Sequence, residues 1–185
     1  NATGTLHVLE AARALPRLER VVVTSSSEVY GTAADGPIGE SHRLCPTSPY
    51  AASKVAADRL AWAYRQTYGL PVAIIRPFNT YGPRHVYDVI PKFIRLALRG
   101  EPLTVHGTGA QARDFTYVDD TVRGFLLMGS HPAAVGDVVN FGSGRAVTIR
   151  ETAERIVAIS GSRSRIEYDA RRAAEVDLLL CDASK

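Results

Sequence analysis

Residues 48–54 read "SPYAASK" and place a phenol and an ammonium group four positions apart, at Tyr50 and Lys54. Side chains with this spacing lie on the same face of a helix. A phenol with its ordinary pKa of about 10 is a poor base at neutral pH, but a nearby positive charge favours the phenolate form. The pair could therefore take the proton from a hydroxyl group that is being oxidised. The same spacing also occurs without any function, because tyrosine and lysine are common residues.

Two further polar stretches follow short apolar runs. The first, "TSSSEVYG" at 24–31, begins within the end of the run at 20–26, and the second, "RPFNTYGPR" at 76–84, begins within the end of the run at 71–77. If both runs are parallel strands, their carboxyl ends meet at one edge of the sheet, which is where ligands bind in open α/β folds. We therefore expect these two stretches and the helix with the tyrosine–lysine pair to converge on one crevice. Each stretch taken alone is also a common kind of polar turn.

The hydrophobic pattern predicts alternating strands and helices. Short runs rich in β-branched residues indicate buried strands, whereas apolar residues three and four positions apart indicate helices. A strand, a helix and a second strand in this order imply a parallel sheet with crossover helices, so the expected fold class is α/β. The predicted strands are 20–26, 71–77, 102–107 and 138–142, and the predicted helices are 2–15, 49–68, 89–100, 117–129 and 148–160.

The composition is that of a globular protein, with 185 residues, 45% of them hydrophobic and 22% charged, and a formal net charge of +3. Lysine and arginine are scattered, so we expect no nucleic-acid partner. No apolar run approaches the roughly 20 residues that span a bilayer, so we expect no membrane segment. Cys45 and Cys181 lack a CxxC spacing and the five histidines stand alone. We therefore expect no metal site and a cytoplasmic location.

Taken together, the motifs resemble those of the extended short-chain dehydrogenase/reductase superfamily, in its branch of NAD-dependent nucleotide-sugar epimerases and dehydratases. The resemblance runs from Asn1 to Lys185. It is carried by the turn at 24–31, the Tyr-xxx-Lys motif, "RPFNTYGPR" at 76–84 and "GEPLTVHGTGAQARDFTYVDD" at 100–120. A Tyr-xxx-Lys motif alone is weak, but the four stretches in this order are specific.

The resemblance implies a Rossmann-like parallel sheet with crossover helices, present only in part, and a smaller α/β C-terminal substrate lobe. It assigns residues 1–82 to the C-terminal part of the NAD-binding domain. Residues 83–185 would form mostly the substrate-binding lobe, with some strands and helices crossing back. It also implies NAD as the cofactor, a nucleotide-diphosphate sugar as the substrate, and a homodimer that packs through the tyrosine-bearing helix and its neighbour.

The first residues already have a helical pattern, and no Met precedes them. Members of the family begin with a GxxGxxG turn that holds the dinucleotide pyrophosphate at a helix N-terminus. We expect this turn to lie upstream of Asn1. On this interpretation the chain is an internal piece that would hold the nicotinamide end of the cofactor but not its phosphates.

The resemblance also assigns roles to the polar side chains at the expected crevice. Tyr50 would be the general base, and Lys54 would lower the pKa of its phenol and hold the nicotinamide ribose. Ser26 would hydrogen-bond the reacting sugar oxygen. Ser25 and Pro77 would complete the contacts to the cofactor.

Glu28 bears on which reaction is catalysed. A carboxylate can remove the proton beside a new 4-keto group, because the carbonyl acidifies that proton. In the family, 4-epimerases usually have a small or apolar residue here, whereas 4,6-dehydratases and UDP-glucuronate decarboxylases have Glu. Many dehydratases have Asp just before it, to protonate the leaving hydroxyl; this chain has Ser27, which could relay a proton. The alternative is that Glu28 is an exposed loop carboxylate.

Further residues match family positions that bind the substrate. Asn79, Arg113 and Arg172 match positions that contact the diphosphate or the sugar, and the planar guanidinium group suits phosphate oxygens. Leu103 and Val105 resemble the short strand that flanks the nucleotide base. Each arginine could instead be a solvated surface charge.

These residues favour a nucleotide-sugar 4,6-dehydratase, in which C4 is oxidised, Glu28 removes the C5 proton, water leaves from C6 and hydride returns at C6. A 4-epimerase would instead return hydride to the other face of C4. A UDP-glucuronate decarboxylase would lose carbon dioxide after the oxidation at C4. A non-catalytic NAD-binding relative is a remote alternative, which the intact set of Ser26, Tyr50 and Lys54 argues against.

Overall fold

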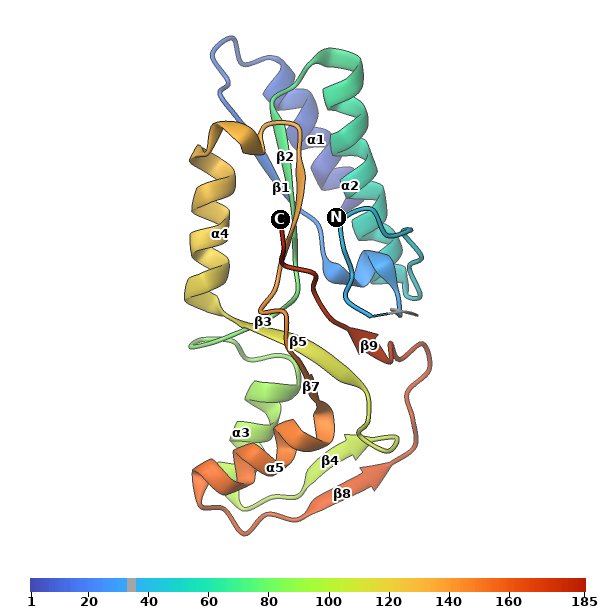
Figure 1. Ribbon diagram of the computed structural model, residues 1–185, viewed down its shortest axis with the longest axis vertical. Coiled ribbons are helices and arrows are strands. Elements are labelled where there is room, and N and C mark those ends of the chain that lie inside the picture. Colours follow the sequence, from blue (N-terminus) through green and yellow to red (C-terminus); the bar gives the residue numbers. More distant parts are fainter. Residues whose placement is uncertain (33–35) are drawn as a thin grey trace.

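The computed structural model describes residues 1–32 and 36–185, drawn as a ribbon in Figure 1. The upper part of that view contains a three-stranded parallel sheet in the order β1–β2–β6. These strands were predicted from their β-branched runs, and the parallel α/β architecture is confirmed. They comprise Val21–Thr24 (β1), Val72–Pro77 (β2) and Val138–Phe141 (β6).

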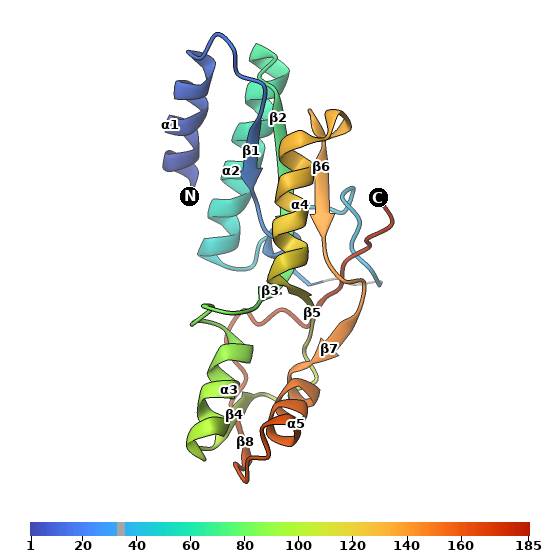
Figure 2. The same cartoon turned by 90° about the vertical axis from the view of Figure 1, so that its left-hand side faces the viewer.

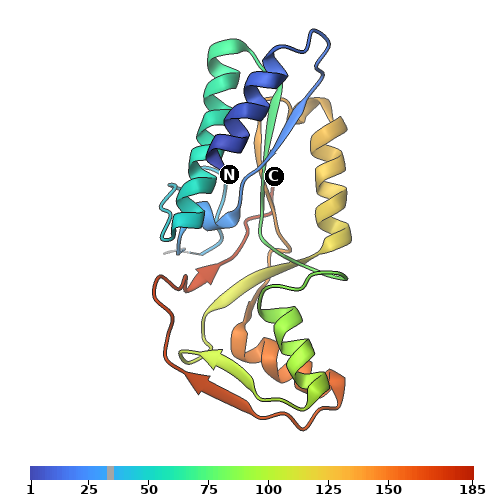
Figure 3. The ribbon, with the colours of Figure 1, turned by 180° about the vertical axis from the view of Figure 1, so that it is seen from behind.

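Helices cover both faces of this sheet. Figures 2 and 3 show α1 (Ala2–Arg13) and α2 (Pro49–Tyr68) on one side of the strands and α4 (Val118–Ser130) on the other. The residues of β2 alternate between the two layers, as side chains of a strand must. Val72 and Ile74 pack toward α1 and α2, whereas Ala73 and Ile75 pack toward α4. A strand buried on both faces explains the uninterrupted apolar run.

Helix α2 begins and ends where the sequence predicts. The Ser48 hydroxyl accepts a hydrogen bond from the Ala51 amide at 3.1 Å, and Pro49 occupies the first turn. Gly69 ends the helix with a φ of 67°, a left-handed conformation that favours glycine. Among the described residues, no helix is long and apolar enough to cross a membrane.

The lower part of Figure 1 is a smaller lobe in which two helices pack on a two-stranded parallel sheet. Its apolar core lies between these layers and includes Phe93 and Ala153, both almost fully buried. The helices are α3 (Val89–Arg99) and α5 (Ile149–Ser160), and the strands are β4 (Leu103–His106) and β8 (Ile166–Asp169).

A third small sheet joins the two lobes. Strand β5 lies at its centre, parallel to β3 and β9 and antiparallel to β7. Sequence analysis did not identify these strands or β8, because they are short and partly polar and lack a clear apolar alternation. The strands of this sheet are β3 (Asn79–Tyr81), β5 (Ala112–Tyr117), β7 (Ala146–Thr148) and β9 (Leu178–Leu179), and the 3-10 helices η1 (Ser27–Tyr30) and η2 (Pro132–Ala134) complete the elements.

Candidate active site

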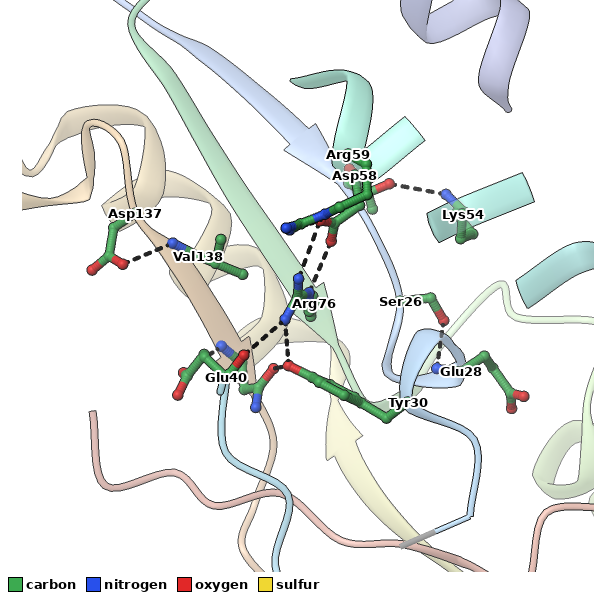
Figure 4. A network of polar contacts seen from close by, with 12 residues as sticks. Ser26, Glu28, Tyr30, Glu40, Lys54, Asp58, Arg59, Arg76, Asp137 and Val138 are labelled. Carbon is green, nitrogen blue, oxygen red and sulfur yellow. Dashed lines mark hydrogen bonds and ion pairs between the residues drawn. The ribbon is translucent and has the colours of Figure 1, made fainter. Parts of the chain in front are cut away.

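The serines after β1 turn the chain into η1 at the carboxyl edge of the sheet. Ser25 continues the pairing with β2, because its amide donates to the Ile75 carbonyl at 2.8 Å. The Ser26 hydroxyl then accepts from the Glu28 amide at 3.2 Å and so caps η1. Ser25, Ser26 and Ser27 are all buried. Glu28 leaves this turn with its carboxylate directed away from the sheet (Figure 4).

Tyr50 and Lys54 lie on the same side of α2, as their spacing predicts. The Lys54 Nζ is 6.0 Å from the centroid of the Tyr50 ring and donates to the Thr24 carbonyl at 3.0 Å. Burial lowers the pKa of the Lys54 ammonium below its ordinary value. The Tyr50 side chain is half exposed at 51%. The phenol is thus open to a ligand while the ammonium group is fixed against the end of β1.

A cavity of about 490 Å³ lies between the sheet edge and the smaller lobe. Glu28 reaches it from η1, Asn79 from β3 and Arg113 from β5. The Oδ1 atom of Asn79 is buried and has no hydrogen-bond partner among the described residues, so it can accept from a ligand. Other lining residues include Lys92, Arg95, Thr104, His106, Arg172 and Glu175.

Several charges act on the Glu28 carboxylate. Burial is the largest influence and raises its pKa, because a low-dielectric site disfavours the ionised form. The charge of Arg113 opposes this effect, whereas Asp88 and Glu175 add to it. The net result is a raised pKa. A half-buried carboxylate with a raised pKa holds a proton more readily than an exposed one.

Arg113 lies in the wall of the same cavity with 11% of its side chain exposed. Its guanidinium donates to the carbonyls of Ala112 at 2.9 Å and Val176 at 2.7 Å, and to the Glu175 carboxylate at 3.2 Å. Burial is the main influence on its pKa, which is lower than the ordinary arginine value. A largely buried guanidinium that has one carboxylate partner among the described residues, next to an open cavity, is a candidate to bind an anion.

A family model described as the NAD dependent epimerase/dehydratase family matches residues 1–142. The chain belongs to this family. The family is NAD-dependent, and its members include both epimerases, which are isomerases, and dehydratases, which are lyases.

Individual relatives of this epimerase/dehydratase chain carry out different reactions. The low-salt glycan biosynthesis protein Agl12 of Haloferax volcanii is 38% identical over 187 residues, which cover 100% of this chain and 60% of that protein. A UDP-glucuronic acid 4-epimerase of Bacillus cereus, crystallised with UDP-glucuronic acid and NAD, matches with a TM-score of 0.94 and 30% identity over 99% of this chain and 58% of that one.

A third relative is a dehydratase. DesIV, a dTDP-glucose 4,6-dehydratase of Streptomyces venezuelae whose crystals contain NAD, matches with a TM-score of 0.93 and 36% identity. The match covers 99% of this chain and 57% of DesIV. The chain therefore spans about three fifths of the length of these relatives.

Strand β4 meets the cavity through different residues from those predicted. Leu103 and Val105 were expected beside the nucleotide base, but both are fully buried in the core of the smaller lobe. Side chains alternate along a strand, so Thr104 and His106 face the cavity instead. The predicted strand is present at Leu103–His106.

The other predicted residues fall into two groups. Glu28, Asn79, Arg113 and Arg172 line the cavity. The remaining ones lie at the carboxyl edge of the sheet, outside the cavity lining, where Pro77 ends β2 opposite Phe141 of β6. This second group consists of Ser25, Ser26, Ser27, Tyr50, Lys54 and Pro77.

Sequence analysis missed a buried polar network behind the sheet edge, shown in Figure 4. The guanidinium of Arg76 forms an ion pair with Asp58, and both side chains are nearly inaccessible, at 2% and 0%. The same guanidinium donates to the Tyr30 hydroxyl, which donates in turn to Asn140. A signal was present, because a charge within the apolar run of β2 requires a buried partner.

Proposed function

We propose that this chain is part of an NAD-dependent nucleotide-sugar 4,6-dehydratase. The observation that supports this reaction most is the position of Glu28 in the cavity wall, directly after the serines that end β1. A simple epimerisation at C4 has no use for a carboxylate there. A dehydration needs a base for the C5 proton, and the raised pKa of Glu28 suits a group that must accept and release protons.

The sheet edge fits the nicotinamide end of a dinucleotide. Lys54 has one hydrogen-bond partner among the described residues, the Thr24 carbonyl, so donors of its ammonium group remain available for ribose hydroxyls. The Tyr50 hydroxyl is accessible beside it. Ser25 and Pro77 would complete the contact at the ends of β1 and β2. NAD bound here would accept hydride from C4 and later return it to the sugar.

In the proposed dehydration, side chains of this protein carry out the proton transfers. Tyr50 takes the proton from the C4 hydroxyl, and the ammonium group of Lys54 stabilises the phenolate that does so. Ser26 hydrogen-bonds the same sugar oxygen. Glu28 then removes the C5 proton, which the new C4 carbonyl has acidified. Ser27 relays the proton that Glu28 has taken up to the departing C6 hydroxyl, which leaves as water.

Cationic side chains in the cavity wall would bind the diphosphate. Arg113 and Arg172 supply guanidinium groups, which match pairs of phosphate oxygens. Asn79 contributes a buried carbonyl oxygen without a protein partner, which suits a donor from the sugar or the nucleotide. Thr104 and His106 take the place at the base that sequence analysis gave to their neighbours.

The assembly and location of the protein are part of the same proposal. Apolar side chains remain exposed on α1 and α2 and just after α1, namely Val8 on α1, Trp62 on α2 and Leu15 in the following turn. Their burial would favour a homodimer that packs through these two helices. Cys45 and Cys181 are free thiols, which is consistent with a cytoplasmic protein.

A second candidate is a reaction that needs no acid at C6. Ser27 occupies the position where many dehydratases have Asp, and this difference favours a 4-epimerase or a UDP-glucuronate decarboxylase. The UDP-glucuronic acid 4-epimerase of Bacillus cereus has the same fold, with a TM-score of 0.94. Glu28 nevertheless favours dehydration over epimerisation, and decarboxylation stays the nearer alternative.

Mass spectrometry of the products separates these reactions. The full-length protein is incubated with NAD and a panel of nucleotide hexoses and nucleotide uronates. We expect a neutral nucleotide hexose to lose the mass of one water and to gain a 4-keto group. Unchanged mass with inverted C4 would establish epimerisation instead, and loss of carbon dioxide from a uronate would establish decarboxylation. Tyr50→Phe is the control, because it removes the base for all three reactions.

A further inference from the structure

Arg76 contacts two of the elements that carry the proposed catalytic groups. Its Nε and Nη2 atoms donate to the two oxygens of Asp58 on α2, at 2.8 and 3.1 Å. Its Nη1 atom donates to the Tyr30 hydroxyl on η1 at 2.7 Å. Arg76 itself belongs to β2 and directly precedes Pro77. One guanidinium group therefore connects α2, η1 and the end of β2, as Figure 4 shows.

The contact between Arg76 and α2 affects the position of the tyrosine–lysine pair on that helix. Tyr50, Lys54 and Asp58 follow one another at intervals of four, so they lie along one side of the helix. The side chains of α2 that are buried against the rest of the lobe are mostly small, including Ala57 and Ala61. The two hydrogen bonds between Arg76 and Asp58 are charge-assisted and bidentate, so they fix α2 relative to the end of β2 with a defined geometry.

The contact between Arg76 and η1 likewise affects the position of Glu28, which belongs to η1. Tyr30 is the last residue of η1, two positions after Glu28, and its hydroxyl lies between Arg76 and Asn140. Asn140 belongs to β6 and donates to the Ile38 carbonyl at 2.9 Å. The orientation of η1 is thus tied to two strands of the sheet. Arg76 also donates to a main-chain carbonyl, that of Glu40, at 3.3 Å.

We propose that Arg76 is a positioning residue, which fixes α2 and η1 against the end of β2 and thereby sets the place of Tyr50 and Lys54 relative to Glu28. The proposal rests on the function proposed above, because it takes these three groups to be catalytic. Its physical basis is independent of the substrate. A planar guanidinium can bind a carboxylate in a bidentate manner and a hydroxyl at the same time, and an ammonium group cannot reproduce that geometry.

The first test compares Arg76→Lys with a variant of equal stability. Leu9→Ala removes a fully buried side chain of α1 in the same lobe and touches none of the proposed catalytic groups. At matched melting temperatures, we expect Arg76→Lys to lower kcat about 10- to 100-fold, because a displacement of about 1 Å has this effect on oriented groups. The acid limb of the kcat/KM profile should also move to higher pH, because Lys54 no longer assists Tyr50. Leu9→Ala should change neither quantity.

The two branches of the network can be separated. Asp58→Asn weakens the contact with α2 and should slow the oxidation at C4, followed as the near-ultraviolet absorbance of reduced nicotinamide. Tyr30→Phe breaks the contact with η1 and should slow the exchange of the C5 proton with deuterated water more than the oxidation. Equal slowing of both steps in both variants would indicate general damage to the fold and would overturn the proposal.

A readout without turnover uses the Lys54 ammonium, because its pKa is lowered by its burial against β1. The full-length protein is labelled with ¹³C-lysine, and the Lys54 resonance is assigned by its loss in Lys54→Met. In Arg76→Lys, we expect the Lys54 pKa to rise toward the ordinary value as the end of α2 becomes more exposed. An unchanged titration would overturn the positioning role. This result stands even if no nucleotide sugar is oxidised, in which case the proposed function alone has failed.

Discussion

The sheet edge and the cavity wall each contain a buried arginine, and the two arginines are held in different ways. Arg76 at the sheet edge is bound by the side chains of Asp58 and Tyr30, which belong to a helix and a 3-10 helix. Arg113 in the cavity wall is bound by two main-chain carbonyls and by Glu175, which lies in a segment between β8 and β9.

The charges of the two sites differ accordingly. Burial would lower the pKa of both guanidinium groups. At Arg76 the bonds and charge of Asp58 outweigh burial, and the pKa is raised. At Arg113 burial prevails, and the pKa is lowered. The guanidinium of Arg113 is therefore incompletely compensated next to an open cavity, which favours an anionic ligand. Under the proposed function, the fully paired Arg76 would hold the sheet edge in place for chemistry, while Arg113 would keep charge available for binding.

The largest effect that we expect comes from the sheet edge. Tyr50→Phe removes the hydroxyl that acts as base and should lower kcat about 10²- to 10⁴-fold, with little change in KM. The half-exposed ring should leave the melting temperature nearly unchanged. Steady-state kinetics and a thermal melt measure both quantities. If kcat is retained, the assignment of the sheet edge to chemistry is wrong.

The cavity wall should give the opposite kinetic pattern. Arg113→Lys keeps the positive charge but loses the planar fork, and we expect KM for the nucleotide sugar to rise about 10- to 100-fold. That range corresponds to one hydrogen bond to a charged group, about 1.5–3 kcal/mol. A matching fall in kcat at unchanged KM would contradict the division between the two regions.

A smaller effect follows from the partner of Arg113. Glu175→Gln removes the carboxylate that competes with an anionic ligand for the guanidinium. We expect KM to fall about two- to fivefold, in line with the modest strength of a partly accessible ion pair. Isothermal titration with the nucleoside diphosphate alone checks the same change without turnover. Weaker binding would mean that Glu175 orients Arg113 and does not compete with the ligand.

The smallest expected effect is on stability. The folded pKa of Glu28 is raised, so its ionisation costs stability as the pH rises through that value. Below its ordinary pKa of about 4.3 the carboxyl is protonated in both states and the cost disappears. Glu28→Gln should therefore melt about 1–2 °C above the wild type at neutral pH and equal to it in acid. A lower melting temperature at neutral pH would contradict the burial of this charge.

The sequence predicted the elements with strong periodicity well and the polar interior poorly. The strands at 21–24 and 72–77 and the helix at 49–68 follow from β-branched runs, a capping serine and a closing glycine. The partners within the arginine network could not be derived, since hydrogen-bond partners such as Tyr30 and Asn140 are far apart along the chain. The alternation of apolar and polar residues along β4 indicates that Leu103 and Val105 are buried, whereas their expected place beside the nucleotide base rested on the family resemblance alone.

Under the proposed function, Glu28 acts after the oxidation at C4 and not during it. The most direct measurement mixes the full-length Glu28→Gln variant rapidly with NAD and the nucleotide hexose that the wild type dehydrates. We predict that the near-ultraviolet absorbance of reduced nicotinamide appears and persists, while no 4-keto-6-deoxy product is detected by mass spectrometry. Formation of that product at the wild-type rate would contradict the account.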